Sequence, residues 1–145
     1  MAYWLFKSEP DVFSWDMLKA KGQAGEEWTG IRNYQARNNM RVMKLGDKGF
    51  YYHSNIGKAV VGIVEVCKLI HPDSTATVPA WECVDIRAVV DLPKSMTLDD
   101  IKLVPELQDM VLVKNSRLSV QPVSADEWQV ICKRCGLKLP PRISA

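Results

Sequence analysis

One short stretch of the sequence gathers side chains suited to binding a planar polar ligand. From Trp28 to Met40 it reads W-T-G-I-R-N-Y-Q-A-R-N-N-M. This stretch is too polar for a core element and too aromatic for a plain surface loop. Aromatic rings can stack on a nucleobase, amide groups can read the edge of the base, and guanidinium groups can contact phosphates. The residue types therefore favour a binding function over a purely structural one.

Three further polar clusters lie at the expected ends of secondary-structure elements. They are K-S-E-P at 7–10, Y-H-S at 52–54 and S-R-L-S-V-Q-P-V at 116–123. Each cluster mixes charged or aromatic residues with Ser or Gln at an element boundary, where binding residues usually lie. Four such clusters in one small sheet are expected to converge on a shared cleft.

Each cluster taken alone also has a structural explanation. Lys7–Glu9 suits a solvated strand exit, and Trp28 suits a core anchor. Arg32 can pair with a nearby acid, His53 can be a hydrogen-bonded and half-buried imidazole, and Ser119 can lie on the solvent face of a strand. For any single cluster the structural explanation is the stronger one. The combination of four clusters favours the binding cleft.

Catalysis is not expected from this sequence. It has no Gly-rich phosphate loop, no zinc-protease motif, no nucleophile elbow and only two His. His53 and Ser54 are adjacent on an expected strand, so their side chains point to opposite faces. An alternative stays open, in which Lys7, Glu9 and His53 act on a nucleotide or an anionic metabolite as an enzyme or a small-molecule binder.

The composition indicates an ordinary globular chain. It has 145 residues, of which 47% are apolar, and a net charge of +2. This length suits one domain with a proper core. A weak positive charge means that any contact with nucleic acid depends on a local patch rather than on the whole surface.

The cysteines predict neither a metal site nor a redox site. Cys67 and Cys83 lie singly in apolar runs and suit small core positions. The C-K-R-C at 132–135 ends an expected helix, whereas a redox motif opens one, and no second pair offers zinc spacing. We therefore expect no metal and no cofactor. With no signal peptide and no membrane-length apolar run, we expect a cytoplasmic protein with reduced thiols.

The elements that must position these clusters follow from periodicity and capping residues. Strands are predicted at 2–6, 48–53, 59–67 and 81–91, with extended chain at 114–123. Helices are predicted at 15–21, 33–43, 97–102, 105–113 and 124–136. Ser14 and Asn33 are expected N-caps, and Ser124 with Glu127 is an expected capping box. This order predicts an α+β fold with a small curved or barrel-like mixed sheet flanked by several helices. We expect a single domain over 1–137 and a loose tail over 138–145.

The four motifs, in this order and at these spacings, resemble the EVE domain family. They are Y-W-L-F-K-S-E-P, W-T-G-I-R-N-Y-Q-A-R-N, F-Y-Y-H-S-N and S-R-L-S-V-Q-P-V, and the resemblance runs from Ala2 to about Leu137. Ile31, where the family often has Val, is a conservative departure. The resemblance implies a PUA-like fold similar to that of YTH domains, which hold a methylated adenine in an aromatic cage. It also implies a module that binds nucleic acid carrying a modified base. The sequence is silent on oligomeric state; we favour a monomer and expect no contact with membranes.

The resemblance further implies the residues of the binding site. Trp28 would stack on a modified cytosine or a methylated adenine in DNA or RNA, and Gly30 would let the backbone approach the base. Asn33 and Ser8 would read the edge of the base, and Glu9 would accept from an exocyclic amine. Arg32, Arg37 and Lys7 would meet phosphates. The family motifs do not mark a second aromatic wall, for which Trp81 is our own candidate. The remaining implied ligand-binding residues are Tyr34, Tyr52, His53, Ser54, Arg117, Leu118 and Ser119.

Overall fold

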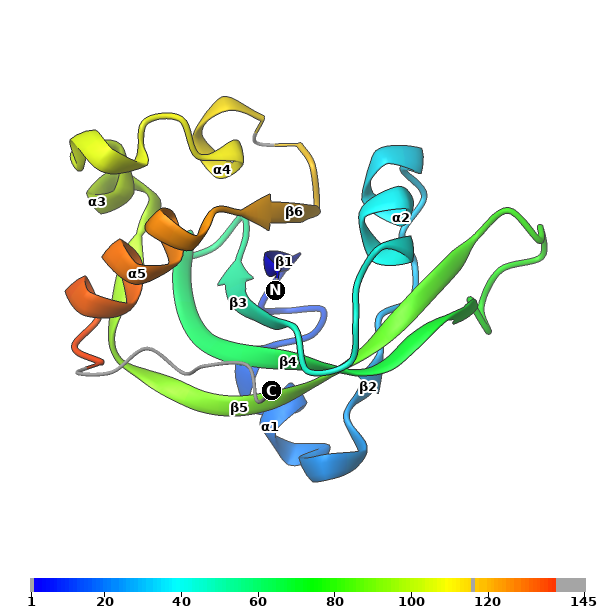
Figure 1. Cartoon of the computed structure of the whole chain (residues 1–145). Coiled ribbons are helices and arrows are strands. Elements are labelled where there is room, and N and C mark those ends of the chain that lie inside the picture. Colours follow the sequence, from blue (N-terminus) through cyan, green and yellow to red (C-terminus); the bar gives the residue numbers. More distant parts are fainter. Residues whose placement is uncertain (1, 116, 138–145) are drawn as a thin grey trace.

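The computed structural model describes residues 2–115 and 117–137, and it confirms the α+β class. Its strands are β1 (Tyr3–Ser8), β2 (Glu26–Glu27), β3 (Lys48–His53), β4 (Ala59–Pro72), β5 (Glu82–Thr97) and β6 (Val120–Val123). They form one six-stranded mixed sheet in the order β2-β5-β4-β3-β1-β6. The sheet is strongly curved, and the long β4–β5 hairpin extends away from its centre (Figure 1).

The helices begin where the sequence places their caps. The α-helices are α1 (Trp15–Ala20), α2 (Tyr34–Arg41), α3 (Leu98–Lys102), α4 (Val111–Lys114) and α5 (Ala125–Arg134), and the 3-10 helices are η1 (Gly22–Ala24) and η2 (Pro105–Leu107). Ser14 caps α1 by accepting from the Met17 N–H, and Asn33 caps α2 by accepting from the Ala36 N–H. Capping boxes open α3 and α5. Each cap satisfies backbone donors that would otherwise lack a partner.

Two strands that run parallel bring distant motifs to one edge of the sheet. β1 pairs with β3 in parallel, and the other strand pairs are antiparallel. In this register Lys7 lies beside Tyr52, and Ser8 lies beside His53. The carboxyl ends of β1 and β3 therefore meet, and the K-S-E-P and Y-H-S motifs become neighbours.

The sheet separates two hydrophobic cores. Trp4 and Phe6 of β1 belong to the first core, which α1 and α2 cover with Leu18, Met40 and other apolar side chains. Leu5, between them in sequence, belongs to the second core. The second core is covered by α3, α4 and α5, which lie together at the opposite end of the molecule from α2 (Figure 1). Successive residues of a strand point to opposite faces, so one strand serves both cores.

Several predicted boundaries were wrong. β4 extends beyond the predicted 59–67 to Pro72, opposite Glu82, and β5 extends beyond the predicted 81–91 to Thr97, opposite Ala59. Several register shifts interrupt their pairing. The single helix predicted at 105–113 is divided into η2 and α4, since Met110 has an extended backbone (ψ 139°). Only 120–123 of the predicted extended segment 114–123 is a strand, and β2 was not predicted. The tail predicted at 138–145 lies outside the described residues.

The cysteine environments agree with buried, protonated thiols. Cys132 and Cys135 are buried at the end of α5, and burial raises their pKa to about 12 and about 11. Burial also raises the pKa of the Cys83 thiol. Within residues 2–115 and 117–137, no helix combines the length and the apolar character needed to cross a bilayer.

Candidate functional site

A cleft of about 290 Å³ opens on the first-core face of the sheet, at the end of β1. We call it the Trp28 cleft; it is lined by Lys7, Ser8, Val12, Phe13, Glu26, Glu27, Trp28, Thr29 and Ile31. Its volume lies at the lower end of the roughly 300–1,000 Å³ typical of small-molecule sites. It therefore suits one small planar group.

Trp28 forms the floor of this cleft and is only 6% exposed. Its ring meets those of Phe6, Phe13 and Tyr51 at steep angles of 83°, 71° and 75°, with centroids 5.7–6.3 Å apart. Such edge-to-face packing is the favoured arrangement of aromatic rings in a core. Trp28 is thus both a core anchor and part of the cleft wall. The structural explanation and the binding explanation of this residue therefore hold together.

The carbonyl of Phe13 ties the loop before α1 to the floor of the cleft. It accepts hydrogen bonds from the Ser8 hydroxyl at 2.9 Å and the Tyr51 hydroxyl at 2.5 Å. Burial, aided slightly by the field of Glu26, raises the pKa of Tyr51 to about 12, so its hydroxyl stays a donor. These bonds hold Phe13 against Trp28 and leave the cleft with a fixed shape.

The two carboxylates of β2 have different surroundings. Glu27 accepts from both the N–H and the hydroxyl of Ser74 at 2.8 Å, and the Cys83 sulfur lies 3.6 Å away. The hydrogen bond from the Ser74 N–H lowers the pKa of Glu27. Glu26 has a looser partner, Lys21, at 3.8 Å. Both carboxylate oxygens of Glu27 therefore accept hydrogen bonds from the β4–β5 hairpin, whereas the carboxylate of Glu26 can still accept one.

Asp73, in the β4–β5 hairpin, fixes the loop that follows Trp28. Its buried carboxylate accepts from the Gly30 N–H at 2.9 Å, from Arg32 at 3.0 Å, and from the N–H and hydroxyl of Thr75. Burial alone would raise the pKa of Asp73, but these hydrogen bonds lower it to about 2. Gly30 has a φ of +83°, which a residue with a side chain rarely adopts. Gly30 is thus needed to aim its N–H at Asp73.

Arginine and aromatic side chains alternate where α2 meets the hairpin. Tyr34 stacks on Trp81 with centroids 4.9 Å apart, Arg37 lies 4.8 Å from the Tyr34 ring and Arg32 lies 5.6 Å from the Trp81 ring. We call these four residues the aromatic–arginine stack. Trp81 does not line the Trp28 cleft, so the rings do not form the expected cage with Trp28 and Trp81 as opposite walls. Tyr34 is 59% exposed and offers an open aromatic surface instead.

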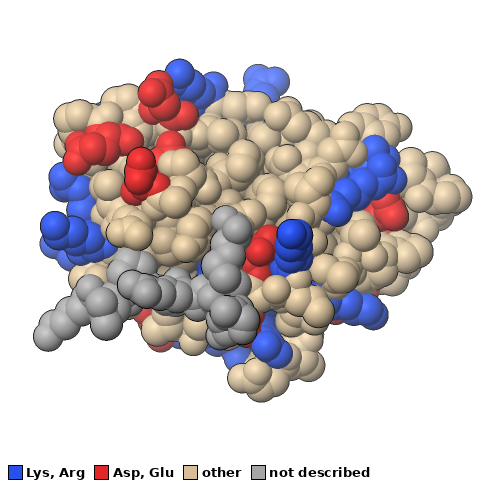
Figure 2. Space-filling model, in the orientation of Figure 1, with Lys and Arg blue, Asp and Glu red and all other residues tan. Residues whose placement is uncertain are grey.

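This region also carries the positive charge. No acidic residue occurs between Trp28 and Gly46, while Arg32, Arg37, Arg41 and Lys44 do. Figure 2 shows Lys and Arg gathered where α2 adjoins the hairpin, and Asp and Glu gathered over the end that holds α3 and α5. Arg41 pairs with Glu82, and Arg37 donates to the Ala80 carbonyl. A local basic patch therefore exists despite the low net charge.

A second cleft, of about 360 Å³, opens on the second-core face of the same strand ends. We call it the Tyr52 cleft; it is lined by Lys7, Glu9, Tyr52, Ser54, Asn55, Lys58, Leu98 and Leu112. The Lys7 ammonium lies 5.8 Å from the Tyr52 ring, and burial lowers its pKa. Glu9 accepts from Asn55 at 3.2 Å. The predicted residues Lys7, Glu9, Tyr52 and Ser54 therefore meet here, away from Trp28.

The other predicted residues have identifiable structural contacts. His53 Nε2 accepts from the Trp15 N–H at 3.0 Å, and burial lowers the pKa of His53. Asn33 is a helix cap and is not aimed at the Trp28 cleft. Leu118 is buried in the first core, and the Ser119 carbonyl accepts from the Lys7 N–H. Arg117 is exposed and lines neither cleft.

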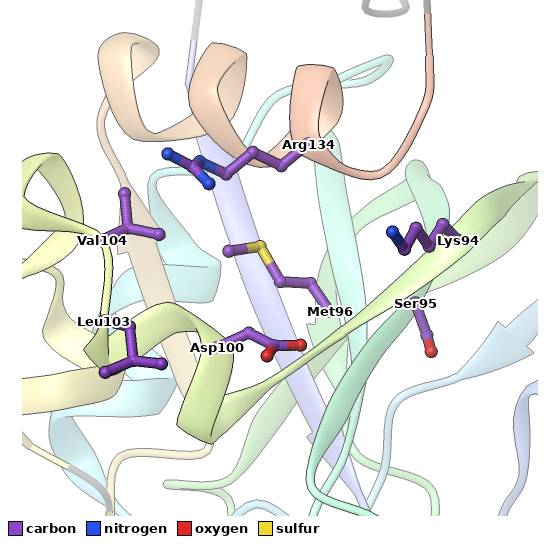
Figure 3. A pocket seen from close by; sticks show the side chains of 7 residues that line it. All are labelled: Lys94, Ser95, Met96, Asp100, Leu103, Val104 and Arg134. Carbon is purple, nitrogen blue, oxygen red and sulfur yellow. The ribbon is translucent and has the colours of Figure 1, made fainter.

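A third pocket, of about 350 Å³, lies between β5, α3 and α5. Arg134 from α5 and Asp100 from α3 approach it from two sides, and Met96 points into its centre (Figure 3). None of its lining residues is aromatic, and none belongs to the four motifs. It therefore offers no stacking surface for a base.

One group of side chains has the composition of a metal site. Atoms of Glu27, His71 and Cys83 lie within 4.8 Å of one another. Glu27 already accepts from Ser74, and His71 Nε2 lies 2.7 Å from Asp85. The three groups are thus engaged in hydrogen bonds that connect β2, β4 and β5.

The sequence reasoning missed several cleft residues. Phe13 and Glu26 lie outside the four motifs, so no motif placed them in a cleft. Alternation backwards from Trp28 would have placed Glu26 on the same side, but the two-residue strand β2 gave no periodic signal. Asp73 was also missed, because its partners Gly30 and Arg32 are far away in sequence.

Comparisons with known proteins agree with this geometry. The model of the EVE domain matches residues 2–134. Thymocyte nuclear protein 1 of Mus musculus is 34% identical over 161 aligned residues, which cover 89% of this chain and 71% of the relative. A solved protein of Agrobacterium tumefaciens is 60% identical, covers 100% of both chains and has a TM-score of 0.98.

Two further solved structures contain nucleic acid. Human THYN1 in complex with DNA containing 5-methylcytosine is 32% identical, with a TM-score of 0.86 over 94% of this chain and 98% of that chain. The YTH domain of Zygosaccharomyces rouxii MRB1, in complex with N6-methyladenosine RNA, is 19% identical, with a TM-score of 0.56 over 92% of this chain and 86% of that chain. The latter likeness confirms the expected fold and carries nothing about ligands.

Proposed function

The chain belongs to the EVE domain family, and we propose that its Trp28 cleft binds a single modified nucleobase, with 5-methylcytosine in DNA as the leading ligand. The observation that carries the proposal is the cleft itself: aromatic walls from Trp28 and Phe13, a hydroxyl from Ser8, and room for one planar group. The relative human THYN1 was crystallised with DNA containing 5-methylcytosine, which supports this ligand. A methylated adenine, in DNA or in RNA, is the next candidate.

The cleft walls suit a base more than a charged metabolite. A base that rests on aromatic side chains gains about 1–3 kcal/mol per stacked base. Val12, Phe13 and Ile31 add apolar surface that a 5-methyl group can contact. A base must leave its stack in a duplex to enter such a cleft, and that cost is a few kcal/mol. Single-stranded ligands should therefore bind more tightly than duplexes of the same sequence.

The basic patch of Arg32, Arg37, Arg41 and Lys44 follows the cleft residues Thr29 and Ile31 in sequence. Thr29 and Ile31 line the cleft, and the next residues reach the aromatic–arginine stack. Arg32 and Arg37 are positioned to contact the phosphates or bases that flank the bound one. Arg32 is already paired with Asp73, so it is a fixed rather than a mobile cation. This arrangement supports a module that holds one base and a few flanking nucleotides.

Binding rather than catalysis is part of the proposal. The alternative of an enzyme used His53 as an acid or base, but His53 Nε2 accepts a backbone hydrogen bond from Trp15. Lys7 and Glu9 line the Tyr52 cleft together with Ser54, whereas His53 does not line it. These contacts support a role for His53 in positioning α1.

The test uses a bulky substitution at the mouth of each cleft. Val12 is 67% exposed, so Val12→Trp should fill the mouth of the Trp28 cleft with little effect on stability. Ser54→Trp makes a matched change at the Tyr52 cleft. Fluorescence anisotropy with a labelled single strand carrying one central 5-methylcytosine or cytosine measures affinity, and urea unfolding confirms that both variants fold.

We expect wild-type protein to prefer the 5-methylcytosine strand, and Val12→Trp to weaken its binding at least about tenfold, which corresponds to about 1.4 kcal/mol. Ser54→Trp should bind like the wild type. Equal binding of modified and unmodified strands, or full binding by Val12→Trp, would refute the proposal. Loss in Ser54→Trp alone would move the site to the Tyr52 cleft.

A further inference from the structure

Glu26 presents its carboxylate to the Trp28 cleft. β2 pairs with β5 in an antiparallel ladder, and the Trp28 N–H continues that ladder by donating to the Val84 carbonyl. Residues two apart in such a segment lie on the same side, so Glu26 and Trp28 share one side and Glu27 takes the other. Both glutamates line the cleft, but Glu27 is hydrogen-bonded to Ser74, whereas the carboxylate of Glu26 has Lys21 at 3.8 Å.

The charge of Glu26 is felt at the floor of the cleft. After burial, its field is a cause of the raised pKa of Tyr51, whose ring lies 5.7 Å from that of Trp28. The side chain of Glu26 is about one-third exposed, at 33%, and Lys21 approaches it only to 3.8 Å. An ionised carboxylate accepts hydrogen bonds and donates none. The side chain therefore offers an acceptor beside the aromatic wall.

We propose that Glu26 reads the exocyclic amino group of the base in the Trp28 cleft, so that the cleft takes amino bases and rejects thymine and uracil. This rests on the function proposed above. Cytosine and adenine carry an amino group, which donates, whereas thymine carries an O4 carbonyl at the corresponding position, which accepts. A carbonyl placed against a carboxylate leaves two acceptors facing each other without a proton. Guanine also carries an amino group, so Glu26 does not exclude it.

This role differs from the one the sequence suggested for Glu9. Glu9 lines the Tyr52 cleft and accepts from Asn55, on the other face of the sheet. The chain thus has two candidate acceptors, one in each cleft. Of the two glutamates that line the Trp28 cleft, Glu27 is held by Ser74, so Glu26 is the candidate there and Glu9 is a matched control in the other cleft.

The pair 5-methylcytosine and thymine isolates the proposed contact. Both are pyrimidines with a methyl group at C5, and they differ at position 4 and in the proton on N3. Apolar contacts with the methyl group and stacking on the aromatic walls are therefore the same for the two bases. A difference in affinity between them reports on the polar edge alone.

The experiment measures Kd by fluorescence anisotropy for single strands that differ only in one central base, either 5-methylcytosine or thymine. For the wild-type protein we expect the 5-methylcytosine strand to bind about 10- to 100-fold more tightly, the range expected for one good polar contact to a base. Glu26→Gln replaces the carboxylate by an amide that also donates, so it can meet the thymine carbonyl. In this variant the ratio should fall below about threefold.

Glu9→Gln makes the same change in charge in the Tyr52 cleft and should keep the wild-type ratio. Urea unfolding of each variant controls for folding. The inference is overturned if the wild type binds both strands equally, or if Glu26→Gln preserves the ratio. If Val12→Trp abolishes binding but the wild type binds the 5-methylcytosine and thymine strands equally, this inference fails and the proposed function stands. If Val12→Trp binds as tightly as the wild type, both this inference and the proposed function fail.

Discussion

The Trp28 cleft and the Tyr52 cleft open at the same strand ends but on opposite faces of the sheet. Ser8 contributes to the first, Glu9 to the second, and Lys7 lines both. The Trp28 cleft has aromatic and apolar walls with a carboxylate beside them. The Tyr52 cleft is lined mainly by polar side chains and two leucines. Residues that are adjacent in one motif can therefore serve two different surfaces.

The two clefts also differ in how they are held in place. The loop that follows Trp28 is tied by Asp73 to the β4–β5 hairpin, and Phe13 is tied to Ser8 and Tyr51. In the Tyr52 cleft, Asn55 and Lys58 have positive φ values of 70° and 34° in a turn. A site that recognises one base benefits from fixed walls, since less conformational entropy is lost on binding. This contrast favours the Trp28 cleft as the base site.

The largest expected effect comes from the floor of the Trp28 cleft. Trp28→Ala should lower the free energy of unfolding by about 3–5 kcal/mol, because it leaves a cavity among Phe6, Phe13 and Tyr51. Trp28→Phe retains an aromatic ring and should lose clearly less. Urea unfolding followed by circular dichroism measures both. Equal stability of Trp28→Ala and wild type would mean that Trp28 is not part of the core.

A smaller effect is expected at the anchor of the loop. The pKa of Asp73 is lowered from 3.8 to about 2 in the folded protein. Its contribution is therefore fully present above pH 4 and is lost as the pH falls toward 2. The shift corresponds to about 2 kcal/mol. Asp73→Asn should lose this amount at pH 7 and weaken base binding, because Gly30 and Arg32 lose their shared acceptor.

Urea unfolding at pH 7 and near pH 3 tests the role of Asp73. The gap in stability between wild type and Asp73→Asn should narrow at the lower pH. Asp91 offers a control carboxylate, because hydrogen bonds from Trp15 and Lys19 lower its pKa. It lies on an exposed surface and not in the hairpin loop. A gap of constant size across this pH range would show that Asp73 does not stabilise the fold through its charge.

The smallest effect is expected at the basic patch. Arg37→Gln should weaken binding to oligonucleotides of any sequence and lower the slope of log K against log salt by about 0.7–0.9, the value for one phosphate contact. Preference for 5-methylcytosine should be unchanged, since Arg37 does not line the cleft. Lys58→Gln, in the Tyr52 cleft, should leave the slope as it is. A reduced slope in Lys58→Gln and not in Arg37→Gln would place the nucleic acid on the other face.

The sequence predicted the helix starts and the central strands well, because caps and periodicity are local signals. Ser14, Asn33 and Ser124 cap helices as expected. The two-residue strand β2 and the division of 105–113 were missed, since pairing partners and the extended turn at Met110 have no local signature. The two long strands were underestimated because their missed ends, 68–72 of β4 and 92–97 of β5, include exposed residues that interrupt the apolar run.

The candidate site was harder to predict than the fold. The K-S-E-P and Y-H-S motifs lie at strand ends that meet in the structure, but a motif does not say which side chains point to which face. Alternation along β1 places Trp4 and Phe6 in one core and Leu5 in the other, and the stacking of Tyr34 on Trp81 depends on a hairpin that the sequence did not place. The role of Asp73 depends on contacts more than 40 residues apart, between it and Gly30 and Arg32.

One measurement decides between the two faces most directly. Amide chemical shifts of the isotope-labelled protein are followed by NMR during titration with a single strand that carries one 5-methylcytosine. We expect the amides of Ser8, Thr29 and Gly30 to shift, and to shift less with the unmodified strand. Shifts confined to Asn55, Lys58 and Leu98, or no shift at either cleft, would contradict the assignment of the Trp28 cleft as the site of base recognition.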